Sequence, residues 1–184
     1  MNNKLKIAIE SVIPEMVKEW NEVKLPIFEK LYEQSFSEYF KGRQTQEKTK
    51  CVAPCLDSIF ARLIEGYIPE FKIDETVGRD YKWGDEGYEC KITLGETNGW
   101  TGNGYAKTPN HILLRFTMNE DGMITHMFAS LVDLNKCESR WTDPTTTSNF
   151  STLSFLKEDV DMINVIIGDI KINRKFIAPI NCRI

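Results

Sequence analysis

The chain has 184 residues, of which 41% are hydrophobic and 27% charged, and its formal net charge at pH 7 is −4. Ten Phe, six Tyr and four Trp exclude a disordered chain, because they supply the large apolar area that disordered chains lack. The negative charge disfavours a protein that coats nucleic acid non-specifically, although it allows a local basic cleft.

Length and hydrophobic pattern together predict one globular domain, residues 1–184. No apolar run approaches the roughly 20 residues of a membrane span. Charged residues interrupt the N-terminal segment where a signal peptide needs its apolar core. The five cysteines are too scattered for a disulfide framework or a paired zinc site. We therefore expect a cytoplasmic protein that does not associate with a membrane.

The first third of the chain, residues 1–66, is predicted to be mainly helical. Apolar residues recur there at helical spacing, and Pro14 and Pro26 each suit the first turn of a new helix. A polar, lysine-rich connection is expected over residues 43–50. The short helix after it is expected to stop at Gly66.

The middle of the chain, residues 71–134, has the alternating pattern of strands. A first hairpin is predicted around the turn at residues 84–87, and a second hairpin joins residues 111–118 to 123–134. A glycine-rich loop over residues 95–110 separates them.

The last part of the chain, residues 135–184, is predicted to contain a polar loop, a short helix over 158–166 and a strand within 167–177 that rejoins the sheet. Helices followed by strands, a helix and a strand indicate an α/β fold. We expect a mixed central β-sheet flanked by helices, with a helical N-terminal third.

The first hairpin determines which side chains share a face. With a turn of two or four residues, we expect Trp83 opposite Tyr88, Lys82 opposite Glu89, and Asp80 opposite Lys91. One face would then be an aromatic core wall that includes Cys90, and the other would carry Asp80, Lys82, Glu89 and Lys91. A three-residue turn would break this arrangement.

Two carboxylates on one small face repel each other unless a cation lies between them. Mg²⁺ suits such a place, because it prefers oxygen ligands and is commonly held by one or two carboxylates. A bound Mg²⁺ lowers the pKa of water and polarises a phosphoryl oxygen, and a nearby lysine can orient the attacking water. The expected chemistry is hydrolysis of a phosphodiester.

Asp80 followed by Glu89-Cys90-Lys91 resembles the core of the PD-(D/E)xK nucleases, and in particular type II restriction endonucleases. Residues 92–94, 99–103 and 111–116 also resemble that group, so the resemblance covers roughly residues 75–135. It implies a restriction-endonuclease-like fold with Asp80, Glu89 and the Cys90 carbonyl as Mg²⁺ ligands. It also implies that Lys91 places the nucleophilic water.

The chain departs from the family pattern at Arg79, which stands where the family has a weakly kept proline. This departure leaves Asp74 and Asp85 as rivals to Asp80 for the first carboxylate. Some family members add a helical glutamate, for which Glu33 and Glu38 are both candidates here.

The glycine-rich loop is expected to approach DNA, because its glycines permit close backbone contact. Its side chains offer stacking, hydrogen bonds to bases and a phosphate contact: Trp100, Thr101, Asn103, Tyr105 and Lys107. A later loop offers a second, weaker group with Lys136, Arg140 and Trp141, whereas His111 and His126 are expected to be packed or surface histidines. No glycine-rich phosphate loop occurs, so no nucleotide cofactor is expected.

These observations favour a Mg²⁺-dependent, sequence-specific endonuclease that acts on double-stranded DNA as a homodimer, because one site cuts one strand of a palindrome. Two alternatives stay open. One is a structure-selective repair nuclease of the same fold. The other is a non-catalytic acidic binding protein of the inhibitor type, in which the four charges form a surface salt-bridge lattice.

Overall fold

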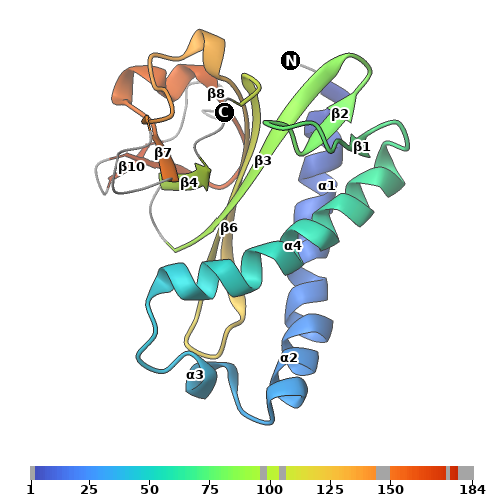
Figure 1. The fold of residues 1–184 in the computed structure, drawn as a ribbon, viewed down its shortest axis with the longest axis vertical. Helices are drawn as coiled ribbons and strands as arrows, with labels where there is room; N and C mark the ends of the chain where they lie inside the picture. The colour runs from blue at the N-terminus through green and yellow to red at the C-terminus, as the bar shows by residue number, and fades with distance from the viewer. Residues whose placement is uncertain (1–2, 96–98, 104–106, 144–149, 173–174, 178–184) are drawn as a thin grey trace.

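The structure, a computed structural model, describes residues 3–95, 99–103, 107–143, 150–172 and 175–177 (Figure 1). Its N-terminal third is helical. The helical segments are α1 (Asn3–Glu19), the π-helical turn η1 (Trp20–Lys24), α2 (Leu25–Tyr32), α3 (Phe36–Tyr39) and α4 (Thr45–Tyr67). None of the described helices combines the length and the apolar character needed to cross a membrane.

Pro14 lies inside α1 and does not begin a new helix, contrary to the prediction. A proline within a helix removes one backbone hydrogen bond and costs about 3 kcal/mol. The apolar stripe of α1 continues across it, however, and Val12, Ile13 and Met16 on either side are all fully buried. Burial of this stripe offsets the cost of the proline. Pro26 does lie in the first turn of α2, as expected.

Helix α4 is longer than its sequence pattern indicates. It begins at Thr45, within the expected polar connection, because Gln44 and Glu47 form a reciprocal capping box at its first turn. It ends at Tyr67, one residue beyond Gly66. Its buried face lies against the sheet and α1 and consists of Val52, Leu56, Ile59, Phe60 and Ile64.

A six-stranded sheet has the order β1-β2-β3-β5-β6-β8. The parallel pair β3–β5 makes it mixed, because its other neighbouring strands are antiparallel. The expected α/β architecture with a mixed central sheet and a helical N-terminal segment is therefore confirmed. The strands in this sheet are β1 (Lys72–Ile73), β2 (Tyr81–Trp83), β3 (Glu86–Leu94), β5 (Asn110–Met118), β6 (Ile124–Asp133) and β8 (Ile163–Ile167).

Two small two-stranded ladders lie outside the central sheet. One replaces predicted loops, and the other replaces the strand that was predicted to rejoin the sheet within residues 167–177. β4 (Gly99–Asn103) pairs with β7 (Phe150–Ser154), so part of the glycine-rich segment is strand. The predicted helix is shorter, because the 3-10 helix η3 (Lys157–Met162) gives way to β8, which joins the central sheet. β9 (Ile170–Ile172) and β10 (Lys175–Ile177) pair only with each other among the described strands. A 3-10 turn, η2 (Leu134–Lys136), follows β6.

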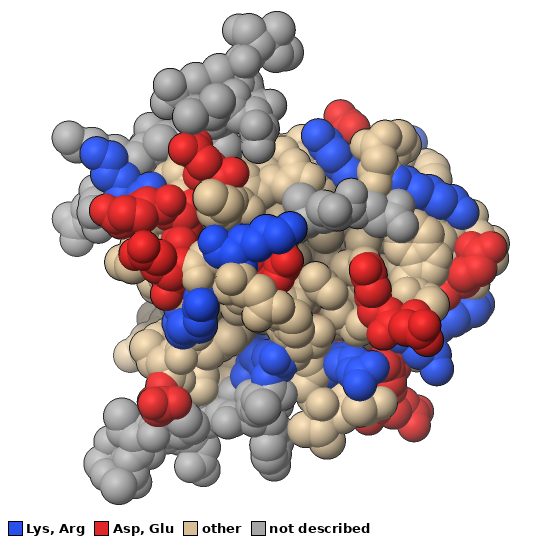
Figure 2. Space-filling model, turned by 90° about the horizontal axis from the view of Figure 1, so that it is seen from above, with Lys and Arg blue, Asp and Glu red and all other residues tan. Residues whose placement is uncertain are grey.

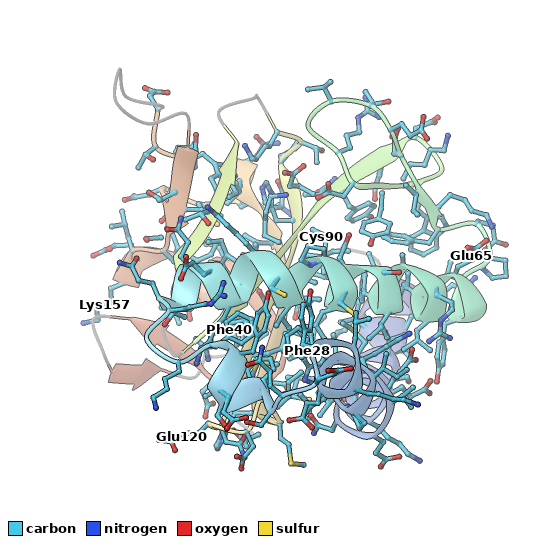
Figure 3. All side chains as sticks on the ribbon, turned by 60° about the horizontal axis from the view of Figure 1, so that its bottom comes forward. Phe28, Phe40, Glu65, Cys90, Glu120 and Lys157 are labelled. Carbon is cyan, nitrogen blue, oxygen red and sulfur yellow. The ribbon has the colours of Figure 1, made fainter. Side chains whose placement is uncertain are left out.

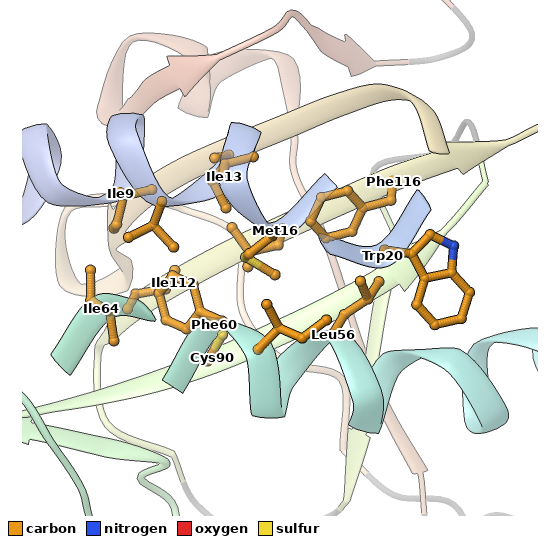
Figure 4. Packing of buried hydrophobic residues seen from close by; sticks show 14 of the residues in the cluster. Ile9, Ile13, Met16, Trp20, Leu56, Phe60, Ile64, Cys90, Ile112 and Phe116 are labelled. Atoms are coloured by element: carbon orange, nitrogen blue, oxygen red, sulfur yellow. The ribbon is translucent and has the colours of Figure 1, made fainter. Parts of the chain in front are cut away.

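Apolar side chains pack on both faces of the sheet. Ile112 and Phe116 of β5 join a cluster with α1 and α4, where Ile9, Met16 and Phe60 meet them (Figure 4). The intervening Leu113 joins a second cluster with β4, β7 and η3. Because alternate residues of a strand point to opposite faces, β5 is buried on both sides and fixes the position of the neighbouring β3.

Candidate active site

The first hairpin has a two-residue turn, Gly84 and Asp85, in which Gly84 adopts φ 60°. Tyr81 lies opposite Tyr88, so the pairing is shifted by two residues from the pairs that we expected. The expected partners are therefore wrong. The faces remain as predicted, because a shift of two residues keeps the side-chain alternation. Tyr88 and Cys90 pack in the helix-side core, and Glu89 and Lys91 alternate with them.

Three oxygen atoms converge on the ammonium of Lys91. Its Nζ lies 2.6 Å from Glu89 Oε1 and 3.2 Å from Asp80 Oδ2. The same Nζ donates a hydrogen bond to the backbone carbonyl of Cys90 at 3.0 Å. The carboxylates of Asp80 and Glu89 and the carbonyl of Cys90 therefore surround one position suited to a cation. These are the three groups that the family resemblance implies as Mg²⁺ ligands.

Asp80 takes this place because it directly precedes β2, whose pairing with β3 stops at Tyr81 and Tyr88 while β3 continues to Leu94. Beyond that point the Cys90 N–H donates to Asp80 Oδ2 at 2.8 Å, so a side chain replaces the missing strand neighbour. The rival carboxylates are engaged elsewhere: Asp74 accepts a hydrogen bond from the Thr76 N–H, and Asp85 lies in the hairpin turn.

Glu89 is buried, with 4% of its side chain exposed. Its second oxygen, Oε2, has no hydrogen-bond partner among the residues that the structure describes. A buried polar atom without a partner costs about 1–3 kcal/mol, so such atoms are rare in folded proteins. An unpartnered carboxylate oxygen beside a cation position fits the donor chemistry of a divalent ion.

The oxygen donors suit Mg²⁺, which is usually held by one or two carboxylates and keeps other positions for water and phosphate. Within the described ranges no group of three or more His, Cys, Asp or Glu side chains is arranged to hold a metal. An ion at this site would therefore depend on Asp80, Glu89 and a backbone carbonyl.

The charge balance of the site favours a protonated Lys91. Burial lowers the pKa of Lys91, but attraction by Asp80 and Glu89 outweighs burial, so its pKa is raised above the usual lysine value. The ammonium therefore neutralises part of the negative charge of the two carboxylates.

A third carboxylate, that of Asp57 on α4, lies beside the site and was not predicted. The hydroxyl of Tyr81 donates to Asp57 Oδ1 at 3.0 Å. Burial raises the pKa of Asp57, and the negative charge of Asp80 raises it further, whereas the tyrosine hydrogen bond opposes this shift. The helical candidates named from the sequence lie elsewhere: Glu33 is exposed at the end of α2, and Glu38 caps α3.

A groove of about 480 Å³ runs past this site, between α4 and the strands β3 and β4. Figure 3 labels Cys90 beside the middle of α4, and Cys90 is one of the residues that line this groove. Asp80, Cys90 and Lys91 contribute to its lining. Its polar walls include Gln46, Thr49, Lys50 and Asp57 from α4, and Thr101 and Gly102 from β4.

The residues predicted to contact DNA occupy different environments. Trp100 is fully buried in the second core cluster, and its Nε1–H donates to the Leu114 carbonyl at 3.2 Å. The expectation that Trp100 stacks on bases does not fit this packing. Thr101 is exposed and lines the groove, and Lys107 is half-buried. The Asn103 side chain and all of Tyr105 lie outside the described residues.

The second group that was predicted to contact DNA lies in the loop after β6. Lys136 is exposed and pairs with Asp133 at 3.5 Å. Arg140 Nη1 donates to the carbonyls of Leu134 and Ser139, at 2.9 and 2.7 Å, so its guanidinium holds its own loop together. Lys and Arg are interspersed with Asp and Glu over the face shown in Figure 2, which has no continuous basic surface among its described residues.

No protein-family model, curated protein or solved structure matches this chain.

Proposed function

We propose that this chain is a Mg²⁺-dependent, sequence-specific endonuclease that hydrolyses phosphodiester bonds in double-stranded DNA. One observation carries the proposal: the oxygens of Asp80, Glu89 and Cys90 converge within 3.2 Å of one cationic nitrogen, at the wall of a groove. Mg²⁺ would be held by these oxygens. When bound, it would supply positive charge that polarises a phosphoryl oxygen and makes water more acidic.

The residues of the chain have separate tasks in this proposal. Asp80 and Glu89 supply negative charge for the ion, and the Cys90 N–H keeps the Asp80 carboxylate in position. Lys91 lies beside the same oxygens, so once an ion has taken its place between the carboxylates its ammonium can orient the attacking water and offset negative charge on the phosphate. Asp57 and Tyr81 fix the hairpin against α4.

Burial disfavours the alternative of a surface salt-bridge lattice. Such a lattice needs exposed charges, which stabilise a protein by about 0–1 kcal/mol a pair. The side chains of Glu89 and Lys91 are only 4% and 19% exposed, respectively. A largely buried Glu89–Lys91 pair with an unpartnered carboxylate oxygen is a costly arrangement for a surface that only binds a partner, even though Asp80 beside it is 40% exposed.

Incubation of the purified protein with diverse unmethylated DNA and Mg²⁺ tests the proposal. We expect discrete fragments, whose ends give the cleavage position, and a protein that sediments as a homodimer. Glu89→Gln should bind DNA without cutting it. Glu86→Gln is the matched control, since Glu86 is an exposed glutamate on the same strand.

Random smearing, or no cleavage with either Mg²⁺ or Mn²⁺, would count against a sequence-specific endonuclease. Selective cleavage of branched DNA would instead support the repair nuclease of the same fold.

A further inference from the structure

Lys107 lies beside the candidate active site, although it follows β4 by several residues. A Cβ atom added at Gly102 would lie 3.1 Å from Lys107 Cε and 3.4 Å from Lys91 Cε. The side chains of both lysines therefore pass the same point above Gly102, which lines the groove. Burial lowers the pKa of Lys107, and the negative charge of Glu89 opposes this shift.

An aromatic ring holds Lys107 in this place. Its Nζ lies 4.6 Å from the centre of the Trp141 ring, within the range of a cation–π interaction. Trp141 also lies 3.4 Å from the position of a Cβ at Gly102. The absence of a side chain at Gly102 thus gives Lys91, Lys107 and Trp141 room to approach one another.

Trp141 is itself anchored to the sheet through His111. The Trp141 Nε1–H donates to His111 Nε2 at 2.9 Å, and His111 Nδ1 lies 3.0 Å from the Pro109 carbonyl. A carbonyl only accepts and an indole N–H only donates, so these two partners require a neutral imidazole with its proton on Nδ1. His111 is fully buried and is paired with Glu89 in the β3–β5 ladder.

We infer that Lys107 is a second cation of the site that contacts a DNA phosphate during cleavage, and that His111 and Trp141 are positioning residues for it. This inference rests on the proposed nuclease function. Lys91 is paired with both carboxylates, so Lys107 adds a second positive charge on the strand side of the groove, where a phosphate would approach. His111 holds Trp141, and Trp141 holds Lys107; we call this chain of contacts the relay. It fixes the position of the Lys107 ammonium relative to Glu89, because His111 and Glu89 are partners in the β3–β5 ladder.

Lys107→Met tests the contact, because it removes the charge and keeps most of the aliphatic chain. The probe is a pool of random-sequence 30-base-pair DNA duplexes, with binding measured in EDTA over a range of salt. We expect weaker binding and a slope of log K against log salt that is smaller by about 1. Single-turnover cleavage with Mg²⁺ should fall by about 10²-fold. Lys107→Arg should restore part of both, and Lys30→Met on α2 is the control for loss of an exposed lysine.

Trp141→Phe tests the relay, since it keeps a ring and removes the N–H donor. We expect its cleavage rate to fall further than its DNA affinity. His111→Gln should shift the NMR signal of the Trp141 indole proton and lower the cleavage rate. If the buried histidine variant does not fold, Trp141→Phe still decides the role of the relay. Wild-type cleavage in Trp141→Phe would overturn this role.

The outcomes separate this inference from the nuclease proposal. If the wild type cleaves DNA and Lys107→Met binds and cleaves equally well, the inference fails while the nuclease function stands. If the wild type binds DNA in a Lys107-dependent way but does not cleave it, the nuclease function fails while the phosphate contact stands. If the wild type neither binds nor cleaves DNA, both fail.

Discussion

The Cys90 N–H donates to the carboxylate of Asp80 at the place where β3 loses β2 as its neighbour. This bond gives Asp80 a structural task beside the chemical one that we propose for it. The carboxylate replaces a strand, and the Cys90 carbonyl next to it accepts from Lys91. The end of the β2–β3 pairing therefore creates the site.

Lys91→Met should destabilise the protein and increase its affinity for Mg²⁺. Removing one partner of a buried ion pair costs about 3 kcal/mol, because a charge is left buried without compensation. In this variant a divalent ion need not displace an ammonium from the carboxylates. We expect Mg²⁺ to raise the unfolding midpoint of Lys91→Met more than that of the wild type. Lys136→Met, which breaks an exposed pair, should respond to Mg²⁺ like the wild type.

Asp57→Asn should make the protein more stable at neutral pH. Burial raises the pKa of Asp57 in the folded state, so the stability of the wild type falls as pH rises from about 3.8 through that higher value. Asparagine keeps the acceptor for the Tyr81 hydroxyl and removes the titration. Urea unfolding should show a gain at pH 7 that disappears below pH 4. A gain in stability over the wild type that is the same at both pH values would contradict this view. Asp85→Asn in the exposed turn is the control.

His111 should make the protein sensitive to mild acid. Burial lowers the pKa of His111 from 6.5 to about 4. The unfolded chain binds this proton first, so stability is lost as pH falls between these values, by about 3 kcal/mol in total. Urea unfolding at pH 7.5 and 4.5 should show a smaller difference for His111→Gln than for the wild type. His126→Gln at an exposed position should keep the wild-type difference.

Gly122→Ala should destabilise the protein much more than Gly42→Ala. Both glycines have positive φ, 84° and 75°, so both substitutions strain the backbone by a similar amount. At Gly122 the new Cβ would also collide with the ring of Phe36, whereas the space at Gly42 is open. Thermal unfolding of the two variants isolates the steric term. A similar decrease in the unfolding temperature of both variants would show that Phe36 moves aside easily.

The faces of the first hairpin could be predicted from the sequence, because alternation survives any even shift of the register. The register itself could not be predicted, since the sequence of residues 84–87 is compatible with both a two-residue and a four-residue turn. Helix α4 was predicted too short because a glutamine cap at Gln44 is a weaker signal than Ser, Thr, Asp or Asn.

Two features of the site depend on contacts between distant segments. Asp57 reaches it because Tyr81, 24 residues away, donates to it, and no local spacing indicates that contact. Trp100 is buried because β4 pairs with β7, about 50 residues later in the chain. A glycine-rich segment with one aromatic residue looks the same in sequence whether it binds a ligand or completes a core.

The ammonium that lies between Asp80 and Glu89 is a built-in counterion. It allows the acidic centre to assemble as the chain folds, before any metal is present. A metal ion that binds must then compete with the Lys91 ammonium, which is covalently part of the chain and is therefore always present at the site. Such competition weakens metal affinity, so occupancy would follow the supply of metal in the surroundings and would not saturate when metal is scarce.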